Sequence, residues 1–115
     1  METNTLPASV QKYITYISIL FKLAEKDICS ASKCRSHYYA RVAVWFIMQE
    51  NGYSLTDCGL FTSPMHTKVY HSKVHKALKD LPALLKVTPY LYEHYTCICE
   101  RFHIDHHPGK PLTAL

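Results

Sequence analysis

The apolar residues of this chain recur at intervals of three and four along most of its length, and no run alternates convincingly between apolar and polar positions. Intervals of three and four place apolar side chains on one face of a helix, whereas a half-buried strand needs alternation. With 48% hydrophobic and 19% charged residues, the composition is that of a globular protein. The sequence therefore predicts an all-α fold, a compact bundle of five to six helices.

Capping residues and prolines divide this pattern into separate helices. Ser54 is typical of a helix N-cap, as is Ser63 before Pro64, while Gly52 suits a helix end because it adopts the left-handed conformation without strain. Pro82 is expected to stop the fourth helix. The expected helices span about 9–27, 37–51, 54–61, 64–81 and 89–103. They form a single helical domain, residues 1–104, followed by a disordered tail, residues 105–115.

Glycine is scarce, which limits the chemistry that the chain can carry. No two of Gly52, Gly59 and Gly109 lie within six residues of each other, so no glycine-rich loop can cradle a phosphate. This argues against an ATPase or a dinucleotide enzyme. Cys58 has no activating neighbour in the sequence and is expected to fill a helix–helix contact, while Trp45 is expected in the core. We therefore expect no enzymatic activity and no cofactor.

The positive charge is concentrated in one segment. The chain carries a net charge of +4, and residues 30–80 hold seven Lys and Arg against three Asp and Glu, which accounts for the whole excess. A localised positive surface is typical of a protein that meets phosphates. The alternative is a basic face that is only solvated and has no partner.

A short capped helix, a brief turn and a longer capped helix with a basic outer face are typical of a helix-turn-helix unit. The second helix of such a unit lies in the major groove of DNA, with its N-terminal residues against the base edges. The amides of its first turn suit a phosphate, and its polar side chains suit base edges. The alternative is a pair of packed helices without a ligand. The candidate contact residues are Ser63, Met65, His66, Thr67, Lys68 and His71.

The order of residues in this unit resembles the C-terminal DNA-binding domain of the bacterial replication initiator DnaA. That family has Ser-Leu, then Ile-Gly, a Phe, and Asp-His-(Ser/Thr)-Thr-Val before a further His. Upstream, residues 40–46 are similar to the family's helix with an Ala-Arg pair, and residues 32–35 lie where the family has a basic loop. The resemblance covers about residues 9–81. The matching residues are Ser54, Leu55, Gly59, Phe61, His66, Thr67, Val69 and His71.

The resemblance implies a fold like that of this domain and of the Trp repressor, and binding of double-stranded DNA. It implies that Lys33 and Arg35 lie in a basic loop against the minor groove or backbone, and that Arg41 contacts a phosphate. Because the family's ATPase domain is absent, the chain is similar to a stand-alone relative of bacterial or phage origin. The implied role is replication initiation, or regulation of a chromosome, phage or mobile element.

Several residues depart from the family pattern at the reading edge. Pro64 and Met65 replace an Arg-Asp pair that takes part in reading the initiator's box sequence, and Lys68 replaces a Thr. Cys58 replaces an Ile, and one residue is missing between Gly59 and His66. We therefore expect the chain to prefer a DNA sequence other than the initiator box.

The segment after Pro82 lies outside the resemblance. Its aromatic helix either completes the core against the first helix or forms a surface for a second copy or a protein partner. The alternative function is accordingly a protein-interaction module that docks a partner, or dimerises, through this helix. Cys97, Cys99 and the histidines after them lack a standard zinc spacing, and on a helix the two cysteines point nearly opposite ways, so no metal is expected.

The cysteine count indicates the compartment. The chain has five cysteines and no secretory signal, and its first apolar stretch is too short and too polar to span a bilayer. We therefore expect a reduced, cytoplasmic protein that does not enter the membrane.

Overall fold

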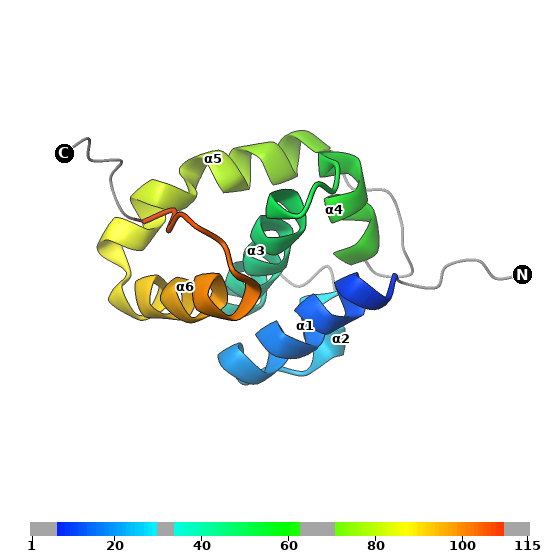
Figure 1. The fold of residues 1–115 in the computed structure, drawn as a ribbon, viewed down its shortest axis with the longest axis horizontal. Coiled ribbons are helices and arrows are strands. Elements are labelled where there is room, and N and C mark those ends of the chain that lie inside the picture. The colour runs from blue at the N-terminus through cyan, green and yellow to red at the C-terminus, as the bar shows by residue number, and fades with distance from the viewer. Residues whose placement is uncertain (1–6, 30–33, 63–70, 110–115) are drawn as a thin grey trace, which may run out of the picture.

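The computed structural model describes residues 7–29, 34–62 and 71–109, and all the regular structure within these ranges is helical (Figure 1). The predicted all-α bundle is confirmed, with six helices in the described residues. These helices are α1 (Ala8–Phe21), α2 (Glu25–Ile28), α3 (Arg35–Glu50), α4 (Leu55–Thr62), α5 (His71–Val87) and α6 (Pro89–Phe102).

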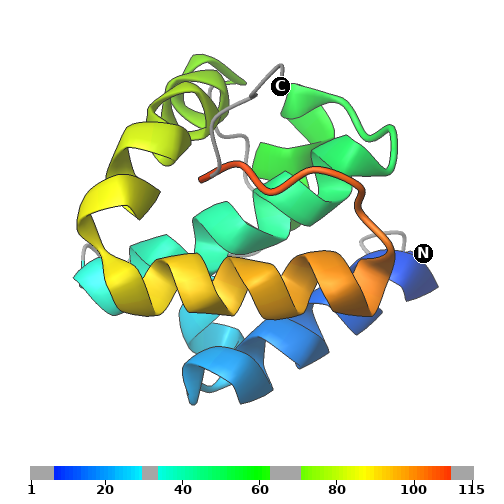
Figure 2. The ribbon, with the colours of Figure 1, turned by 60° about the vertical axis from the view of Figure 1, so that its left-hand side comes forward.

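Helix α3 runs through the middle of the bundle and packs against each of the other five described helices (Figures 1 and 2). Residues 40–48 form an unbroken buried run along it. Apart from Arg41 this run is apolar on all sides of the helix, and such a helix is buried on all sides, which explains its central position. Trp45 is 4% exposed, so its predicted place in the core is confirmed.

The predicted first helix, residues 9–27, is two helices in the structure. Helix α1 ends at Phe21 because Lys22 adopts a left-handed conformation, with a φ of 58°, and the Leu23 N–H donates to the Ser18 carbonyl. A non-glycine residue in this region costs about 1–2 kcal/mol. Complete burial of Ile28 at the end of α2 offsets that cost, since it contributes about 1.5–3 kcal/mol.

The junction between α3 and α4 follows the sequence signals. Gly52 has a φ of 91° directly after the end of α3, as a left-handed helix stop requires. The Ser54 hydroxyl accepts a 3.0 Å hydrogen bond from the Asp57 N–H at the beginning of α4. The predicted helix end and the predicted N-cap are both confirmed.

Helix α5 passes through Pro82, where the sequence predicts a stop, and continues to Val87. Proline inside a helix costs about 3 kcal/mol because it removes one backbone hydrogen bond and crowds the preceding turn. The continuation buries Leu85, which is 1% exposed, and keeps Leu81 in the core. Each buried leucine contributes about 1.5–3 kcal/mol, so burial offsets the cost of the proline. The predicted beginning of this helix at Pro64 lies outside the described residues.

Helix α6 matches its predicted position to within one residue, and its apolar face completes the core. Leu91, Tyr95 and Ile98 are each exposed by 1% or less. At the end of the helix, the Phe102 ring meets the rings of Tyr13 and Tyr16 of α1 edge to face, with 5.3 Å between the ring centroids in both pairs. Of the two predicted uses of this aromatic face, the structure shows core completion.

Residues 105–109, which belong to the expected tail, fold back over the bundle (Figure 2). The His106 ring nitrogen Nε2 lies 2.9 Å from the Glu50 carboxylate. The His107 ring stacks on Tyr92 at 4.2 Å, and the Gly109 N–H donates to His107 Nδ1. Proline and glycine in this segment indicate a loop, but they do not show whether its histidines find partners. The prediction for residues 110–115 lies outside the described residues.

Candidate nucleic-acid interface

Most of the predicted reading edge lies outside the described residues. This holds for five residues of the expected turn and reading helix, and for Lys33 of the expected basic loop. His71 is the first residue of α5, and its side chain also lies outside the described part. The five residues of the expected turn and reading helix are Ser63, Met65, His66, Thr67 and Lys68. The described part of the interface is therefore the body of α5, the beginning of α3 and the whole of α4.

Helix α5 separates an apolar face from a basic one. The side chains of Val74, Ala77, Leu81 and Leu85 are buried and follow one stripe of the helix. At 100° per residue Lys76, Lys79 and Lys86 lie on the opposite arc, whereas Lys73 lies at the edge of the buried stripe, and all four lysines are exposed. The single acid of α5, Asp80, bonds Lys76 at 3.2 Å. The exposed lysines are Lys73, Lys76, Lys79 and Lys86.

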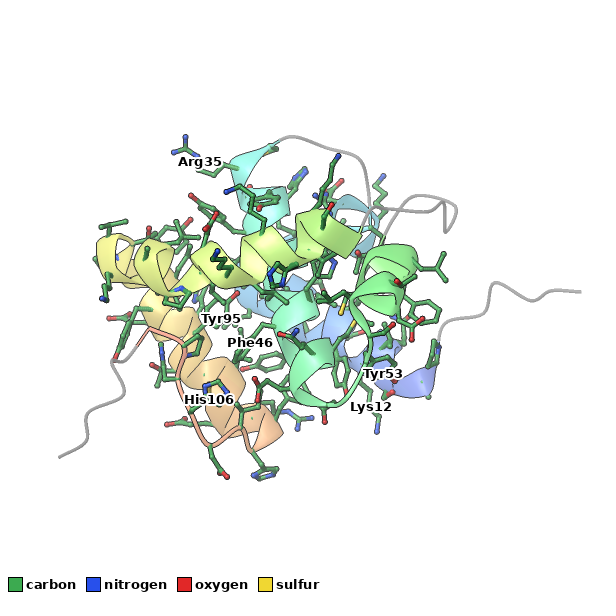
Figure 3. All side chains as sticks on the ribbon, turned by 90° about the horizontal axis from the view of Figure 1, so that it is seen from above. Lys12, Arg35, Phe46, Tyr53, Tyr95 and His106 are labelled. Carbon is green, nitrogen blue, oxygen red and sulfur yellow. The ribbon has the colours of Figure 1, made fainter. Side chains whose placement is uncertain are left out.

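The beginning of α3 lies against the middle of α5. Burial raises the pKa of Tyr38, and the negative charge of Asp80 raises it further while the charge of Lys76 lowers it. Tyr38 therefore lies close to both groups, and Arg35, one turn before it, shares this side of the molecule. The Arg35 side chain is exposed and extends away from the body of the protein (Figure 3).

Hydrogen-bond donors gather at the N-terminal end of α3, where the Asp27 carboxylate also lies 3.9 Å from the His37 ring. Cys34, which precedes the helix, is exposed, and its pKa is lowered by hydrogen bonds from the Ser36 hydroxyl and from the backbone N–H groups of His37 and Ser36. These amides have no partner within the helix ladder because they belong to its first turn. Arg35 thus adds a full charge to a helix end that already favours anions.

Arg41 differs from its predicted role as a phosphate contact. It is 9% exposed, and its Nε donates a 2.8 Å hydrogen bond to the Ile28 carbonyl. Its Nη2 is also buried and has no hydrogen-bond partner among the described residues, and burial lowers the pKa of the Arg41 guanidinium. Arg41 holds α2 against α3, and its position gives the predicted phosphate contact no support. The resemblance matches Arg41 to the arginine of the family's Ala-Arg pair, but the sequence does not show that α2 covers the Arg41 side chain.

Helix α4 is held on α3 by a short chain of buried hydrogen bonds. The Trp45 Nε1–H donates to the Thr62 hydroxyl at 2.7 Å, and that hydroxyl donates to the Cys58 carbonyl at 2.8 Å. Cys58 is fully buried, as predicted, and burial raises its pKa to about 12. At that pKa the thiol stays protonated near neutral pH, so it is not an activated nucleophile.

The cysteines of α6 point in different directions. Cys97 is exposed, whereas Cys99 is buried and its thiol donates to the His106 carbonyl at 3.4 Å. The prediction that they face apart is confirmed. Within the described ranges, no group of three or more His, Cys, Asp or Glu side chains is arranged to hold a metal ion.

Sequence reasoning selects the first turns of the reading helix but not Lys73 and Lys76. The amphipathic period finds Lys76, which lies opposite the buried residues, but not Lys73, which lies four residues before the buried Ala77 and whose exposure only the structure shows. Their closeness to the beginning of α3 has no sequence signal, because it depends on how α3 and α5 pack.

No protein-family model, curated protein or solved structure was found to match this chain. Among the described residues, no helix has both the length and the apolar character that crossing a bilayer requires.

Proposed function

We propose that this protein binds double-stranded DNA in a sequence-specific manner through a helix-turn-helix unit formed by α4 and α5. In this unit α5 enters the major groove, and α4 supports it from behind. The arrangement is supported by the packing of α4 on both α3 and α5 and by the buried bonds that fix the last turn of α4.

The observation that carries the proposal is the basic face of α5. All four of its lysines are exposed, three of them on the face opposite the core and Lys73 at the edge of that face, with one acid among them. A solvated helix on a protein surface ordinarily mixes both signs of charge, whereas a stripe of one sign suits a polyanion. Phosphate contacts of this kind supply most of the affinity of a DNA-binding protein.

Arg35 is the second contact point in this proposal. It lies on the side of the bundle where α3 meets α5, at a helix end whose amides favour anions. An exposed arginine beside a recognition helix can reach the adjacent backbone or minor groove. Lys33, in the expected basic loop, is proposed for the same role by its position in the sequence.

The resemblance to the DnaA DNA-binding domain supports a cellular role in replication initiation, or in the regulation of a chromosome, phage or mobile element. Such a role places the protein in the cytoplasm. The replacement of the family's Arg-Asp pair by Pro64 and Met65 supports a target other than the initiator box.

The test is fluorescence anisotropy with labelled random duplexes, followed by selection of preferred sites. Affinity is expected to fall steeply with salt, with a log–log slope of about −0.9 per neutralised phosphate. Arg35→Ala is expected to weaken binding on all sequences, whereas His66→Ala, Thr67→Ala and Lys68→Ala are expected to alter the selected site. Absence of binding by the wild type at low salt would contradict the proposal.

The protein-interaction module is less well supported. Its proposed surface is the apolar face of α6, and the residues of that face lie inside this chain's own core. Val87 and Tyr90 are exposed at the junction of α5 and α6, at 77% and 51%, but only Tyr90 belongs to the aromatic helix.

A further inference from the structure

One edge of α5 carries an acid between two lysines. Asp80 and Lys73 are seven residues apart, which is almost two full turns, so they share this edge, and Lys76 lies beside them. The Lys76 ammonium lies 3.2 Å from the Asp80 carboxylate, and the two side chains are 78% and 60% exposed. An ion pair that is this exposed is weak, so another anion can displace the carboxylate.

Tyr38 of α3 lies against this edge of α5. Tyr39 of α3 and Leu81 of α5 line the same small internal void, so the two helices meet at this level. Tyr38 directly precedes Tyr39, and Asp80 directly precedes Leu81. The charges of Asp80 and Lys76 both act on the Tyr38 hydroxyl, which places that hydroxyl beside the exposed ion pair.

Tyr38 is held in place and presents a hydrogen-bond donor. Its ring meets the buried Trp45 ring edge to face at 6.5 Å and the Tyr39 ring at 6.2 Å, while the residue as a whole is 39% exposed. Burial raises the pKa of Tyr38, so the hydroxyl keeps its proton near neutral pH. A donor that packing already positions costs little to order when a ligand binds.

Two cations act on the Tyr38 hydroxyl from different sides. The exposed Lys76 lies on α5, and the buried Arg41 guanidinium lies one turn further along α3. Arg41 makes no contact of its own with solvent at Nη2, but its charge still favours an anion at Tyr38. Arg35, three residues before Tyr38, adds an exposed positive charge on the same side of α3. The negative charge that acts on the hydroxyl is that of Asp80.

We propose that the Tyr38 hydroxyl and the Lys76 ammonium bind one backbone phosphate of the duplex, and that Asp80 competes with this phosphate. A carboxylate and a phosphate both offer anionic acceptor oxygens, so Asp80 holds Lys76 in the free protein as the phosphate holds it in the complex. Tyrosine hydroxyls are common phosphate donors in DNA complexes. Asp80 thus restrains the affinity of the basic face. This inference rests on the proposed DNA binding.

The test measures anisotropy of a labelled random duplex with two variants of opposite expected sign. Tyr38→Phe removes only the hydroxyl and is expected to weaken binding about three- to tenfold, with an unchanged salt slope because no charge is lost. Asp80→Asn frees Lys76 and is expected to tighten binding about two- to fivefold and to steepen the log–log slope by up to about 0.9. A gain in affinity cannot come from a variant that is partly unfolded.

Two matched controls lie outside the proposed contact. Tyr90→Phe removes the hydroxyl of an exposed tyrosine at the beginning of α6, and Glu100→Gln removes an exposed acid that lies beside Tyr16 of α1. Both are expected to leave the affinity and the slope nearly unchanged. In a Lys76→Met background, Asp80→Asn is expected to lose most of its gain, because no ammonium is left to free.

The outcomes separate this inference from the proposed function. If the wild type binds the duplex but Tyr38→Phe behaves like Tyr90→Phe, or Asp80→Asn behaves like Glu100→Gln, this inference is overturned and DNA binding stands. An undiminished gain from Asp80→Asn in the Lys76→Met background would also overturn the competition between Asp80 and the phosphate. If the wild type binds no duplex at low salt, the proposed function itself fails.

Discussion

The hydrogen bond between Trp45 and Thr62 is predicted to carry much of the attachment of α4 to α3. Thr62 is 1% exposed, and its hydroxyl accepts from the Trp45 indole at 2.7 Å. Thr62→Val keeps the volume and shape of the side chain but removes this acceptor. The indole N–H is then buried without a partner, which costs about 1–3 kcal/mol.

The expected loss of stability can be assigned to the hydrogen bond between Trp45 and Thr62, because the other partner of the Thr62 hydroxyl keeps a donor in the variant. The Thr62 hydroxyl also donates to the Cys58 carbonyl, but that carbonyl is four residues back on the same helix and accepts the helical N–H as well. In a Trp45→Phe background there is no indole N–H to leave unpaired. Thr62→Val is therefore expected to cost less than about 0.5 kcal/mol there, within the range of a neutral substitution.

The assay is urea unfolding of four proteins, the wild type, both single variants and the double variant, followed by circular dichroism. The double-mutant cycle is expected to give a coupling of about 1–2 kcal/mol between the two sites. Thr56→Val is the control, since Thr56 is an exposed threonine of the same helix and should change stability by less than about 0.5 kcal/mol. If Thr62→Val costs no more than Thr56→Val in the wild-type background, the indole is not bonded to Thr62 and the described position of α4 is wrong.

Three other features give sharp expectations. Helix-end hydrogen bonds lower the pKa of Cys34, while burial raises that of Cys58 to about 12. A thiol reagent near neutral pH should therefore label Cys34 early and Cys58 only after unfolding, and rapid labelling of Cys58 would contradict its burial. Burial lowers the pKa of His94, so on acidification this side chain is protonated in the unfolded chain before it is protonated in the folded chain. The free energy of unfolding should therefore fall below about pH 6.5, and should fall less in His94→Gln; equal pH profiles of the two proteins would refute this. Gly109→Ala places a Cβ 2.9 Å from the Tyr92 ring and should cost about 1–3 kcal/mol in urea unfolding, as overpacking does; an unchanged midpoint would show that the folded-back segment is not packed as described.

The periodic apolar pattern and the caps predict most of the fold. Ser54 and Gly52 set the junction of α3 and α4, and the spacing of Leu91, Tyr95 and Ile98 sets the buried face of α6. These features are local, since each depends on residues within one or two turns of the chain. Local chemistry is what a single sequence displays most directly.

The errors occur where tertiary burial outweighs a local preference. Lys22 ends α1 in a conformation that lysine rarely adopts, because the chain must turn to bury Ile28. Pro82 does not stop α5, because Leu85 still has a place in the core beyond it. In both cases a local cost of a few kcal/mol is offset by burial that the sequence alone does not display.

The candidate site is predictable in part for the same reason. Most of the basic face of α5 follows from its amphipathic period. Arg35 is exposed, as a residue of the expected basic loop would be, but the structure makes it the first residue of α3. The burial of Arg41 does not follow, because its cover comes from Ile28 on a separate short helix. The closeness of Tyr38 to Lys76 cannot be predicted from the sequence either, because it depends on the packing of α3 against α5.

The most direct test of the central claim compares Lys73→Ala with Lys12→Ala in salt-dependent binding to a duplex. Both lysines are exposed, but Lys73 lies in the first turn of α5, whereas Lys12 lies on α1, far from Arg35 (Figure 3). Each substitution removes one charge, so a merely nonspecific attraction would be reduced equally by both. If α5 contacts DNA, Lys73→Ala should lower the affinity and flatten the log–log salt slope by about 0.9, while Lys12→Ala leaves the slope unchanged. Identical slopes for the two variants would contradict binding through α5.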